Sequence, residues 1–585
     1  LKPFWSQSSA RTPAVRLLPP LKMVARQAAP AGKRKEDETG SERLEVSDDD
    51  AAWILGKAGK TKQKIAQVSG CHIEFFDEDL ALEFTGTSKQ RQRAQKYVRC
   101  VMAQRGGPVT VTQEDVDDDC TVLTVPQTAI GFVTGKGGNF LRTLEDEYNT
   151  IMCFADLEGF ESREEESDLM IFGDRRSRRG AQLSVMAVVE TKVPGHYTDR
   201  YHDAGDTFDD KTDLVGDWAT EAMELTNDEL SYAIGSRGKT RKKIAASSEC
   251  IVQYVSNICF FSGTRKQRER AKEYLKLLLE MLEGRRDQGP FTFDPKGRDD
   301  CTVLKVPKDC VGYVTGKNRE AMGNIEAEYG TLMFFLSKDT AGDSGKPVEE
   351  LVIFGNERAR RGSELVLMCA VERKEPGYYT NGMQDKKCTG KGFDTDRLTM
   401  EGDDMAYALG KEGTTRNKIA KASHALLQFV GTMAFIAGDA RERQRCRNYL
   451  GWLLEQKDGK LHIDTRDCTE TTALDVQAED IGWLLGSGLQ HVRKVEQECG
   501  VFCVMTGDDA DAQMLICGHE EGTAYSATGR AKAERLLKRI VKERDWHKER
   551  DWNNRNGGKG GKGGKGGKGG KGGGGRDRSR SPRRG

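Results

Sequence analysis

The sequence predicts an α+β fold of six tandem modules, arranged as three pairs between disordered termini. The first observation is an eleven-residue segment that begins at Gly56 and returns at Gly235 and Gly410, 179 and 175 residues apart. This spacing is a long-period internal repeat. The second is that alternating strands and an amphipathic helix follow the segment. The third is that an unlike but related unit stands between successive copies.

In each copy of the segment, a short apolar helix runs into the first glycine of a Gly-x-x-Gly loop, and a basic helix begins after the second. Glycines without Cβ allow a ligand close to the backbone, and the free N–H groups of a helix's first turn favour anions. Lys57, Lys60, Arg237 and Lys239 add positive charge at this point. The segment is therefore typical of a phosphate-contacting loop.

The segment does not fit a nucleotide-binding P-loop, although Gly59-Lys60-Thr61 matches the second half of that motif. The P-loop requires a further glycine five positions before the Gly of Gly-Lys-Thr. Ile54 and Ala233 occupy that position in the first and second copies. The simplest ATPase or GTPase hypothesis is thereby excluded.

The remaining elements of the first module follow from periodicity. A first strand is expected at Arg43–Val46, with Ser47 or a following aspartate as cap of the next helix. Two alternating strands are expected at Cys71–Phe76 and Ala81–Gly86. A final helix carries apolar residues at helical spacing, namely Ala94, Tyr97, Val98, Val101 and Met102.

This order resembles the KH (K-homology) RNA-binding module of the eukaryotic topology, β-α-α-β-β-α. The resemblance implies a three-stranded antiparallel sheet packed against three helices in each module. It also implies a single-stranded RNA partner, because the Gly-x-x-Gly loop of that family clamps about four nucleotides. No cofactor, metal ion or catalytic activity is expected.

The intervening units have the same order of elements. In the second module a strand at Cys120–Pro126 leads through a helix to Gly135-Lys136-Gly137-Gly138. A second helix, a strand at Ile151–Phe154, a polar excursion, a strand at Leu169–Gly173 and a last helix from about Arg175 follow. The fourth module begins almost identically, at Cys301–Pro307.

The module boundaries follow from these elements and from changes in composition. We expect modules one to six at 41–107, 118–195, 221–284, 299–380, 396–459 and 468–544, linkers at 196–220 and 381–395, a disordered basic arm at 1–40 and a disordered basic tail at 545–585.

The loops are not equivalent. Module four has Arg319 and module six has Leu489 in place of the second glycine, so by family logic both are structural. Module five keeps both glycines but carries Glu412 between them, which weakens phosphate binding. The residues expected to contact RNA are Gly56, Lys57, Ala58, Gly59, Lys60, Gly135, Lys136, Gly137, Gly138, Gly235, Ser236, Arg237, Gly238, Lys239, Gly410, Lys411 and Gly413.

A plainer interpretation stays open at each of these places. A Gly-x-x-Gly turn also serves as a tight corner between two helices. Lysines such as Lys62, Lys64, Lys242 and Lys243 are typical of a solvated helix face. Few aromatic residues are available to stack bases, which favours a KH groove over an aromatic platform.

The formal net charge is zero, but the charge is unevenly distributed. Residues 546–585 contain 13 Lys and Arg against three acids. Gly557–Gly575 holds Gly-Gly-Lys repeats, expected to be a flexible, sequence-blind phosphate binder. The segment 576–584 resembles the Arg-Ser segments of splicing-associated proteins, with Ser579 and Ser581 as phosphorylation candidates. A merely solubilising tail is the alternative.

Cysteine usage and the N-terminal arm bear on the compartment. The 15 cysteines are scattered without paired metal spacing, which favours buried, reduced thiols. A nuclear, or nuclear and cytoplasmic, protein is expected. The arm is acid-poor up to Glu36, so an organellar transit peptide is the alternative, and Met23 is a candidate start.

The favoured function is multivalent binding of single-stranded RNA in pre-mRNA processing or ribonucleoprotein assembly, with several weak sites acting together. The alternative is a protein–protein scaffold of a ribonucleoprotein, or a translational or organellar RNA regulator, in which only the basic tail contacts RNA. An enzyme is disfavoured, since eight scattered histidines show no metal spacing and no nucleophile motif is present.

Overall fold

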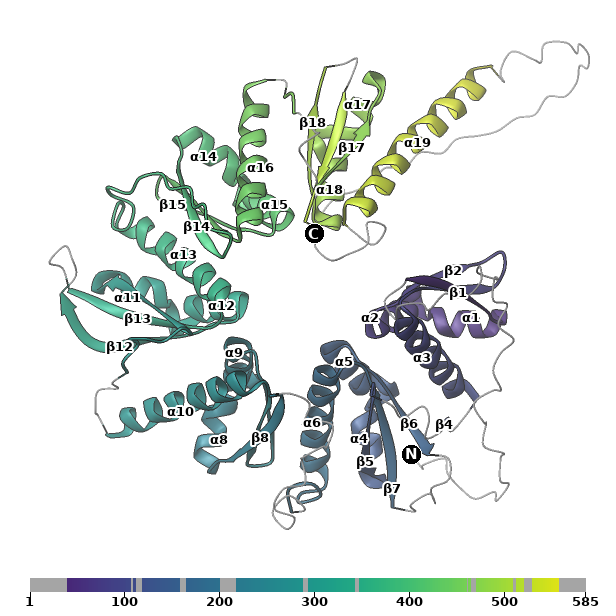
Figure 1. The fold of residues 1–585 in the computed structure, drawn as a ribbon, viewed down its shortest axis with the longest axis vertical. Coiled ribbons are helices and arrows are strands. Elements are labelled where there is room, and N and C mark those ends of the chain that lie inside the picture. Colours follow the sequence, from purple (N-terminus) through teal and green to yellow (C-terminus); the bar gives the residue numbers. More distant parts are fainter. Residues whose placement is uncertain are drawn as a thin grey trace, which may run out of the picture. The chain divides into compact units, whose positions relative to one another are not determined.

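The computed structural model describes residues 39–106, 109–111, 118–157, 165–199, 217–287, 293–341, 347–459, 461–463, 470–508, 512–519 and 529–556. Residues 1–38 of the expected disordered arm and 557–585 of the expected tail lie outside these residues, and Gly40 belongs to a strand. The chain divides into two compact units, Leu1–Glu375 with modules one to four and Pro376–Gly585 with modules five and six (Figure 1).

Module one shows the arrangement that the other modules repeat. Its elements are β1 (Gly40–Glu45), α1 (Asp48–Leu55), α2 (Lys60–Ser69), β2 (His72–Phe76), β3 (Ala81–Gly86) and α3 (Ser88–Gly106). The strands form an antiparallel sheet in the order β1-β3-β2. Ser47 caps α1, because its hydroxyl accepts the N–H of Asp50 at 3.2 Å. The predicted β-α-α-β-β-α order is confirmed.

The other modules contain the same six elements. Module two has β5 (Cys120–Pro126), α4 (Gln127–Thr134), α5 (Asn139–Tyr148), β6 (Ile151–Leu157), β7 (Glu166–Phe172) and α6 (Arg175–Lys192). Module three has β8 (Ala219–Glu224), α8 (Asn227–Ile234), α9 (Lys239–Ser248), β9 (Ile251–Val255), β10 (Ile258–Gly263) and α10 (Arg265–Asp287). Module four has β11 (Cys301–Pro307), α11 (Lys308–Thr315), α12 (Glu320–Tyr329), β12 (Leu332–Ala341), β13 (Pro347–Phe354) and α13 (Glu357–Lys374).

Modules five and six complete the series. Module five has β14 (Asp394–Thr399), α14 (Gly402–Leu409), α15 (Thr414–Ser423), β15 (Leu426–Val430), β16 (Met433–Gly438) and α16 (Ala440–Asp458). Module six has β17 (Thr471–Asp475), α17 (Ala478–Leu485), α18 (Gln490–Cys499), β18 (Phe502–Thr506), β19 (Gln513–Cys517) and α19 (Gly529–Asn556).

One face of each sheet packs on the helices of its own module. In module one, Ile54, Phe84 and Val98 are fully buried in that layer. The described cysteines are all free, and most are buried. Burial raises the pKa of Cys71 to about 11 and that of Cys120 to about 12, so these thiols stay protonated at neutral pH.

The other face of each even-numbered sheet is covered by the last helix of the preceding module. Each such helix brings a buried tyrosine against a buried phenylalanine of the next sheet. The ring centroids are 5.6 Å apart for Tyr97 and Phe172, 4.9 Å for Tyr274 and Phe354, and 5.6 Å for Tyr449 and Phe502. Each pair of modules therefore shares one hydrophobic core.

Within the first unit, module two also docks on module three. The helix α6 packs against β9 and β10, where Val255, Ile258 and Phe260 join the core of module two. Arg176 donates to the carbonyl of Glu249 at 2.7 Å. Modules one to four thus dock in succession, each last helix covering the next sheet.

The structure adds three features to the predicted fold. A short strand, β4 (Val109–Val111), pairs in parallel with β6 and gives module two a fourth strand, because buried Val109 joins the shared core. The helix α19 continues to Asn556, so residues 545–556 are helical and the expected disordered tail from 545 is wrong for this part. An isolated bridge joins Lys386 to Arg397, within and just beyond the expected linker at 381–395.

Among the described residues, no helix combines the length and the apolar character that a membrane span requires.

Candidate nucleic-acid interface

The six loops share one backbone conformation. Each is a single 3₁₀ turn between two helices: η1 (Lys57–Gly59), η3 (Lys136–Gly138), η4 (Ser236–Gly238), η5 (Lys317–Arg319), η6 (Lys411–Gly413) and η8 (Ser487–Leu489). The third and fourth loop positions are left-handed in every copy. Successive left-handed residues turn the chain between the helices within four residues.

The first glycine is required by packing. Gly56 has φ +64°, and a Cβ there would lie 2.1 Å from Thr61 Oγ1. The same contact would be 2.1 Å at Gly235 and 2.3 Å at Gly410. This glycine therefore allows the second helix to approach the first, as the plainer corner interpretation holds.

The fourth position is open. Gly59 has φ +75°, and nothing lies within 4 Å of a Cβ built on it. Arg319 and Leu489 adopt the same left-handed conformation, each with φ 63°, so the degenerate loops keep the backbone of the intact ones. Packing does not require a glycine at the fourth position. A glycine there, having no side chain, leaves room for a ligand.

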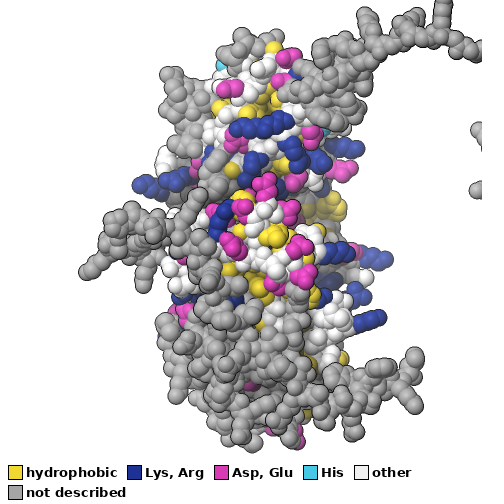
Figure 2. Space-filling model, turned by 90° about the vertical axis from the view of Figure 1, so that its right-hand side faces the viewer, with side chains coloured by type: hydrophobic (Ala, Val, Ile, Leu, Met, Phe, Trp, Pro, Cys, Tyr) yellow, Lys and Arg dark blue, Asp and Glu magenta, His cyan; other side chains and the backbone are white. Residues whose placement is uncertain are grey.

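The loop face is accessible. The second and third positions of all six loops are exposed, including Lys57, Lys136 and Arg237. In each described loop, no side chain caps the helix that follows. The first-turn N–H groups therefore have no side-chain partner and carry the positive end of the helix dipole. Figure 2 shows Lys and Arg side chains interspersed with Asp and Glu, so the positive charge is local.

The three altered loops differ in their side chains. Arg319 turns back on its own module, with its guanidinium 2.9 Å from Glu326 Oε1 and donating to the carbonyl of Met333. Leu489 is 45% exposed. In module five, Glu412 is exposed, whereas Gly413 is buried beside the guanidinium of Arg416, 3.8 Å from its Cβ position.

Two of the lysines assigned to a solvated helix face lie instead at a junction between modules. Lys64 Nζ is 2.9 Å from Glu145 Oε2, and Lys243 pairs with Glu326, whose side chain is fully buried. Lys418 repeats the contact with Glu496 at 3.0 Å. That interpretation is wrong for Lys64 and Lys243, because the docked neighbour brings a buried carboxylate to them.

Burial and the ion pair shift the pKa values of this contact in opposite ways. Burial raises the pKa of Glu145, and Lys64 offsets only part of that rise. Burial also works to lower the pKa of Lys64, but Glu145 and Asp146 outweigh it and raise that pKa. The ion pair therefore favours the charged form of each group and opposes the effect of burial.

An aromatic residue precedes each first glycine by three positions, a regularity that sequence reasoning missed. The set is Trp53, Phe132, Tyr232, Tyr313, Tyr407 and Trp483. All except Tyr232 are among the large hydrophobic side chains that stay exposed. The indole N–H of Trp53 donates to the carbonyl of Val101 at 2.9 Å, and that of Trp483 to Ile540 at 3.0 Å. The constant spacing of three residues between the aromatic residue and the first glycine is the sequence signal that could have revealed this set.

The described residues do not meet the requirements of a metal site. No group of three His, Cys, Asp or Glu side chains there could hold a metal ion. The loops present backbone N–H groups and exposed lysine or arginine charges, which suit the binding of an anion.

Comparison with known proteins identifies the family of two modules. Residues 41–100 and 120–187, in modules one and two, match the KH domain family. The chain therefore contains KH domains. The KH family is a binding module, in agreement with the expectation that the chain is not an enzyme.

The relatives that match this chain have low sequence identity to it. It is 22% identical over 326 residues to human far upstream element-binding protein 2, covering 50% of this chain and 44% of the relative. It is 20% identical over 330 residues to human far upstream element-binding protein 1, covering 52% of this chain and 50% of the relative. The chain thus spans about half the length of these relatives. A solved structure of Dim2p from Pyrococcus horikoshii matches at 14% identity, covering 28% of this chain and 99% of that one, with a TM-score of 0.15.

Proposed function

We propose that this protein binds single-stranded RNA at several sites, through the intact Gly-x-x-Gly loops of modules one, two and three. The observation that carries the proposal is the left-handed fourth position beside helix N–H groups without a side-chain cap at Gly59, Gly138 and Gly238. A Cβ would meet nothing within 4 Å at Gly59, and only an arginine side chain at Gly138 and Gly238. A strand's phosphates can approach such a surface closely, and KH loops clamp the backbone of about four nucleotides.

The remaining loops contribute less to phosphate binding. Module five binds weakly, because Glu412 repels a phosphate and Gly413 is buried. Modules four and six do not clamp a phosphate through their loops, since Arg319 and Leu489 replace the open glycine. Short footprints on one chain raise affinity by effective concentration, and a strand spanning several loops is the preferred ligand.

Paired acidic substitutions in the loops test the proposal. The test combines three double substitutions, all at exposed positions: Lys57→Asp with Ala58→Asp, Lys136→Asp with Gly137→Asp, and Ser236→Asp with Arg237→Asp. Asp tolerates the left-handed third position. At physiological salt, the combined variant is expected to lose roughly tenfold or more of the affinity for a random 40-nucleotide RNA, because repulsion replaces attraction at three sites.

Module four supplies a matched control. Lys317→Asp with Asn318→Asp makes the same change in charge as the module-one variant, in a loop without the second glycine. It is expected to leave RNA affinity nearly unchanged. The scaffold alternative would replace this proposal if RNA affinity is kept in the combined loop variant and is lost when residues 546–585 are deleted.

The biological setting is part of the same proposal. We place the protein in the nucleus, or in nucleus and cytoplasm, in pre-mRNA processing or ribonucleoprotein assembly, with other ribonucleoprotein components as further partners. The KH match and the Arg-Ser-like segment at 576–584 support this setting. Cross-linking and sequencing of bound RNA would test it, since intronic reads are expected and organellar transcripts would contradict it.

A further inference from the structure

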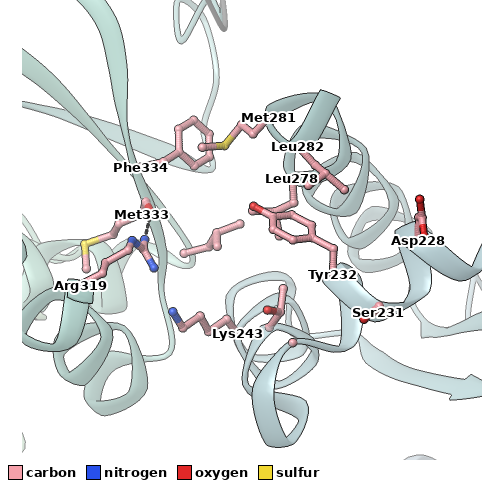
Figure 3. A pocket seen from close by; sticks show the side chains of 13 residues that line it. Asp228, Ser231, Tyr232, Lys243, Leu278, Met281, Leu282, Arg319, Met333 and Phe334 are labelled. Carbon is pink, nitrogen blue, oxygen red and sulfur yellow. Dashed lines mark hydrogen bonds between the residues drawn. The ribbon is translucent and has the colours of Figure 1, made fainter. Parts of the chain in front are cut away.

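A pocket of about 600 Å³ lies where module three meets module four (Figure 3). Tyr232 of α8 forms one wall, and Arg319 and Met333 of module four form the opposite wall. Lys243 of α9 lies between them, and apolar side chains of α10 and β12 close the rest. Because each module supplies only part of the lining, the pocket exists only in the docked pair.

The pocket is continuous with the intact loop of module three. Gly235, the first glycine of that loop, is itself a lining residue. The exposed residues Ser236 and Arg237 follow it directly. An RNA strand held by this loop therefore passes the mouth of the pocket, and a neighbouring nucleotide can enter it.

Arg319 and Lys243 bring cationic donors to the pocket, whose other polar lining residues are Asp228, Ser231 and Thr240. Both oxygens of the buried Glu326 carboxylate accept bonds, from Arg319, from Lys243 and from the N–H of Met333. These contacts and the bond to the Met333 carbonyl use three of the five N–H groups of Arg319, whose side chain is 39% exposed. Two cations thus share one carboxylate, which leaves positive charge and unused donors beside the pocket.

These features fit one nucleotide. A volume of about 600 Å³ lies within the range of small-ligand pockets. An aromatic ring on one wall stacks on a base, which every base permits. Cationic donors favour a base edge with carbonyl acceptors, as in guanine or uracil, over the amino groups of adenine or cytosine.

The other two pairs lack this combination. The position of Arg319 is held by Gly138 in pair one and by Leu489 in pair three. The position of Phe334 is held by Cys153 and Val504. Pair one nevertheless keeps the ion pair of Lys64 with Glu145, so the arginine is not needed for docking.

We propose that this pocket binds the base of one RNA nucleotide adjoining those held by the Gly235–Gly238 loop, with selectivity for guanine or uracil. The proposal rests on the proposed function, because the loop of module three must hold the strand. Module four then takes part in recognition through Arg319, although its own loop lacks the second glycine.

Photo-cross-linking tests the location. The full chain is irradiated with a random 12-nucleotide RNA containing 4-thiouridine, and the linked peptides are identified by mass spectrometry. Cross-links are expected both in the Ser236–Gly238 loop and at Tyr232 or Met333. Cross-links in the loop with none in the pocket would overturn this inference and leave the proposed function standing. Cross-links in none of the intact loops would overturn the proposed function.

Affinity measurements test the chemistry. They use full chain in which modules one and two carry the acidic pairs and Lys411→Asp disables module five, so that module three holds the intact loop. Oligouridylate of 12 nucleotides is expected to bind at least fivefold more tightly than oligocytidylate. Tyr232→Ala is expected to weaken oligouridylate binding about tenfold, and Arg319→Gly to remove the preference for uracil.

Tyr313→Ala is the matched control, because it removes the exposed aromatic residue at the same loop position of module four. Arg319→Gly reproduces the glycine of pair one and is expected to fold, which thermal unfolding checks. If Tyr232→Ala and Tyr313→Ala have equal effects, or if the uracil preference survives Arg319→Gly, the inference is wrong.

Discussion

Lys64 Nζ lies 2.9 Å from Glu145 Oε2, although 81 residues separate them in the sequence. The second oxygen of Glu145 accepts the N–H of Met152 at 2.7 Å, at the start of β6. Glu326 and Glu496 repeat this double role with Met333 and Cys503, each at 2.9 Å. In all three pairs, one buried carboxylate joins the second helix of one module to the sheet edge and helix of the next.

Removing this carboxylate is expected to loosen the pair. Glu145→Ala leaves Lys64 and the Met152 N–H without their partner, at a cost of about 2 kcal/mol, below the range for fully buried pairs because Lys64 is 22% exposed. Glu145→Gln keeps an acceptor for Met152 and is expected to cost about half as much. Hydrogen exchange of peptides covering β6 measures the opening.

Glu147→Ala is the control, because Glu147 is exposed on the same helix. The alanine variant at Glu145 should raise exchange in β6, and the one at Glu147 should not. Equal exchange in both variants would mean that the ion pair does not hold the junction.

The two glycines of a loop should fail in different ways. Gly56→Ala places a Cβ 2.1 Å from Thr61 Oγ1 at φ +64° and is expected to cost about 2–4 kcal/mol of module stability. Gly59→Ala meets no atom within 4 Å and is expected to cost only about 1 kcal/mol, for the left-handed backbone. The free energy of unfolding, measured in urea, separates them.

RNA binding should rank these variants differently. Gly59→Ala puts a methyl group where the phosphate approaches, so its RNA affinity is expected to fall although the module stays folded. A Gly59→Ala variant that melts earlier than Gly56→Ala would show that the fourth position is packed, against the geometry found here.

The sequence could predict the features that depend on residues close together in the chain. The glycine spacing at Gly56 and Gly59 and the apolar periodicity of Val98 and Val101 depend on residues a few positions apart, so elements and loops followed from them. Docking depends on a surface that only folding assembles. Lys64 therefore had the sequence character of a solvated lysine, and its buried partner lies in the next module. Arg319 was recognised as a missing glycine, but its place in an intermodular pocket depends on the same docking.

Acid is expected to loosen the junction of modules three and four. Asp300 accepts the hydroxyl of Tyr274 at 2.9 Å and pairs with Arg298. Burial acts to raise the pKa of Asp300, but Arg298 and Tyr274 outweigh burial and lower the pKa below 3.8. A lowered pKa in the folded state gives stability that is present above about pH 3.8 and is lost as the pH falls through the lowered value.

The comparison of wild type with Asp300→Asn isolates this contribution. At pH 7 the variant is expected to be less stable by about 1–2 kcal/mol, the value of a hydrogen bond to a charged group. This difference should shrink toward zero below pH 3.8. Urea unfolding at a series of pH values gives the difference in unfolding free energy between wild type and variant. If this difference is constant with pH, the charge of Asp300 does not contribute to stability.

Module six offers a gain of function. Gly488 and Leu489 already have left-handed φ values of 61° and 63°, so the loop needs no change of backbone to bind a phosphate. Ser487→Lys with Leu489→Gly gives the loop the same residues as Gly135–Gly138 of module two. In a chain whose other loops carry acidic pairs, this variant is expected to bind RNA about three- to tenfold more tightly, which corresponds to roughly 1 kcal/mol for one added charge and an open backbone.

Ser487→Lys with Leu489→Ala adds the charge without the open position and should recover only a small part of that gain. If both double variants bind equally well, charge alone accounts for the increase, and the open fourth position is not what admits the phosphate.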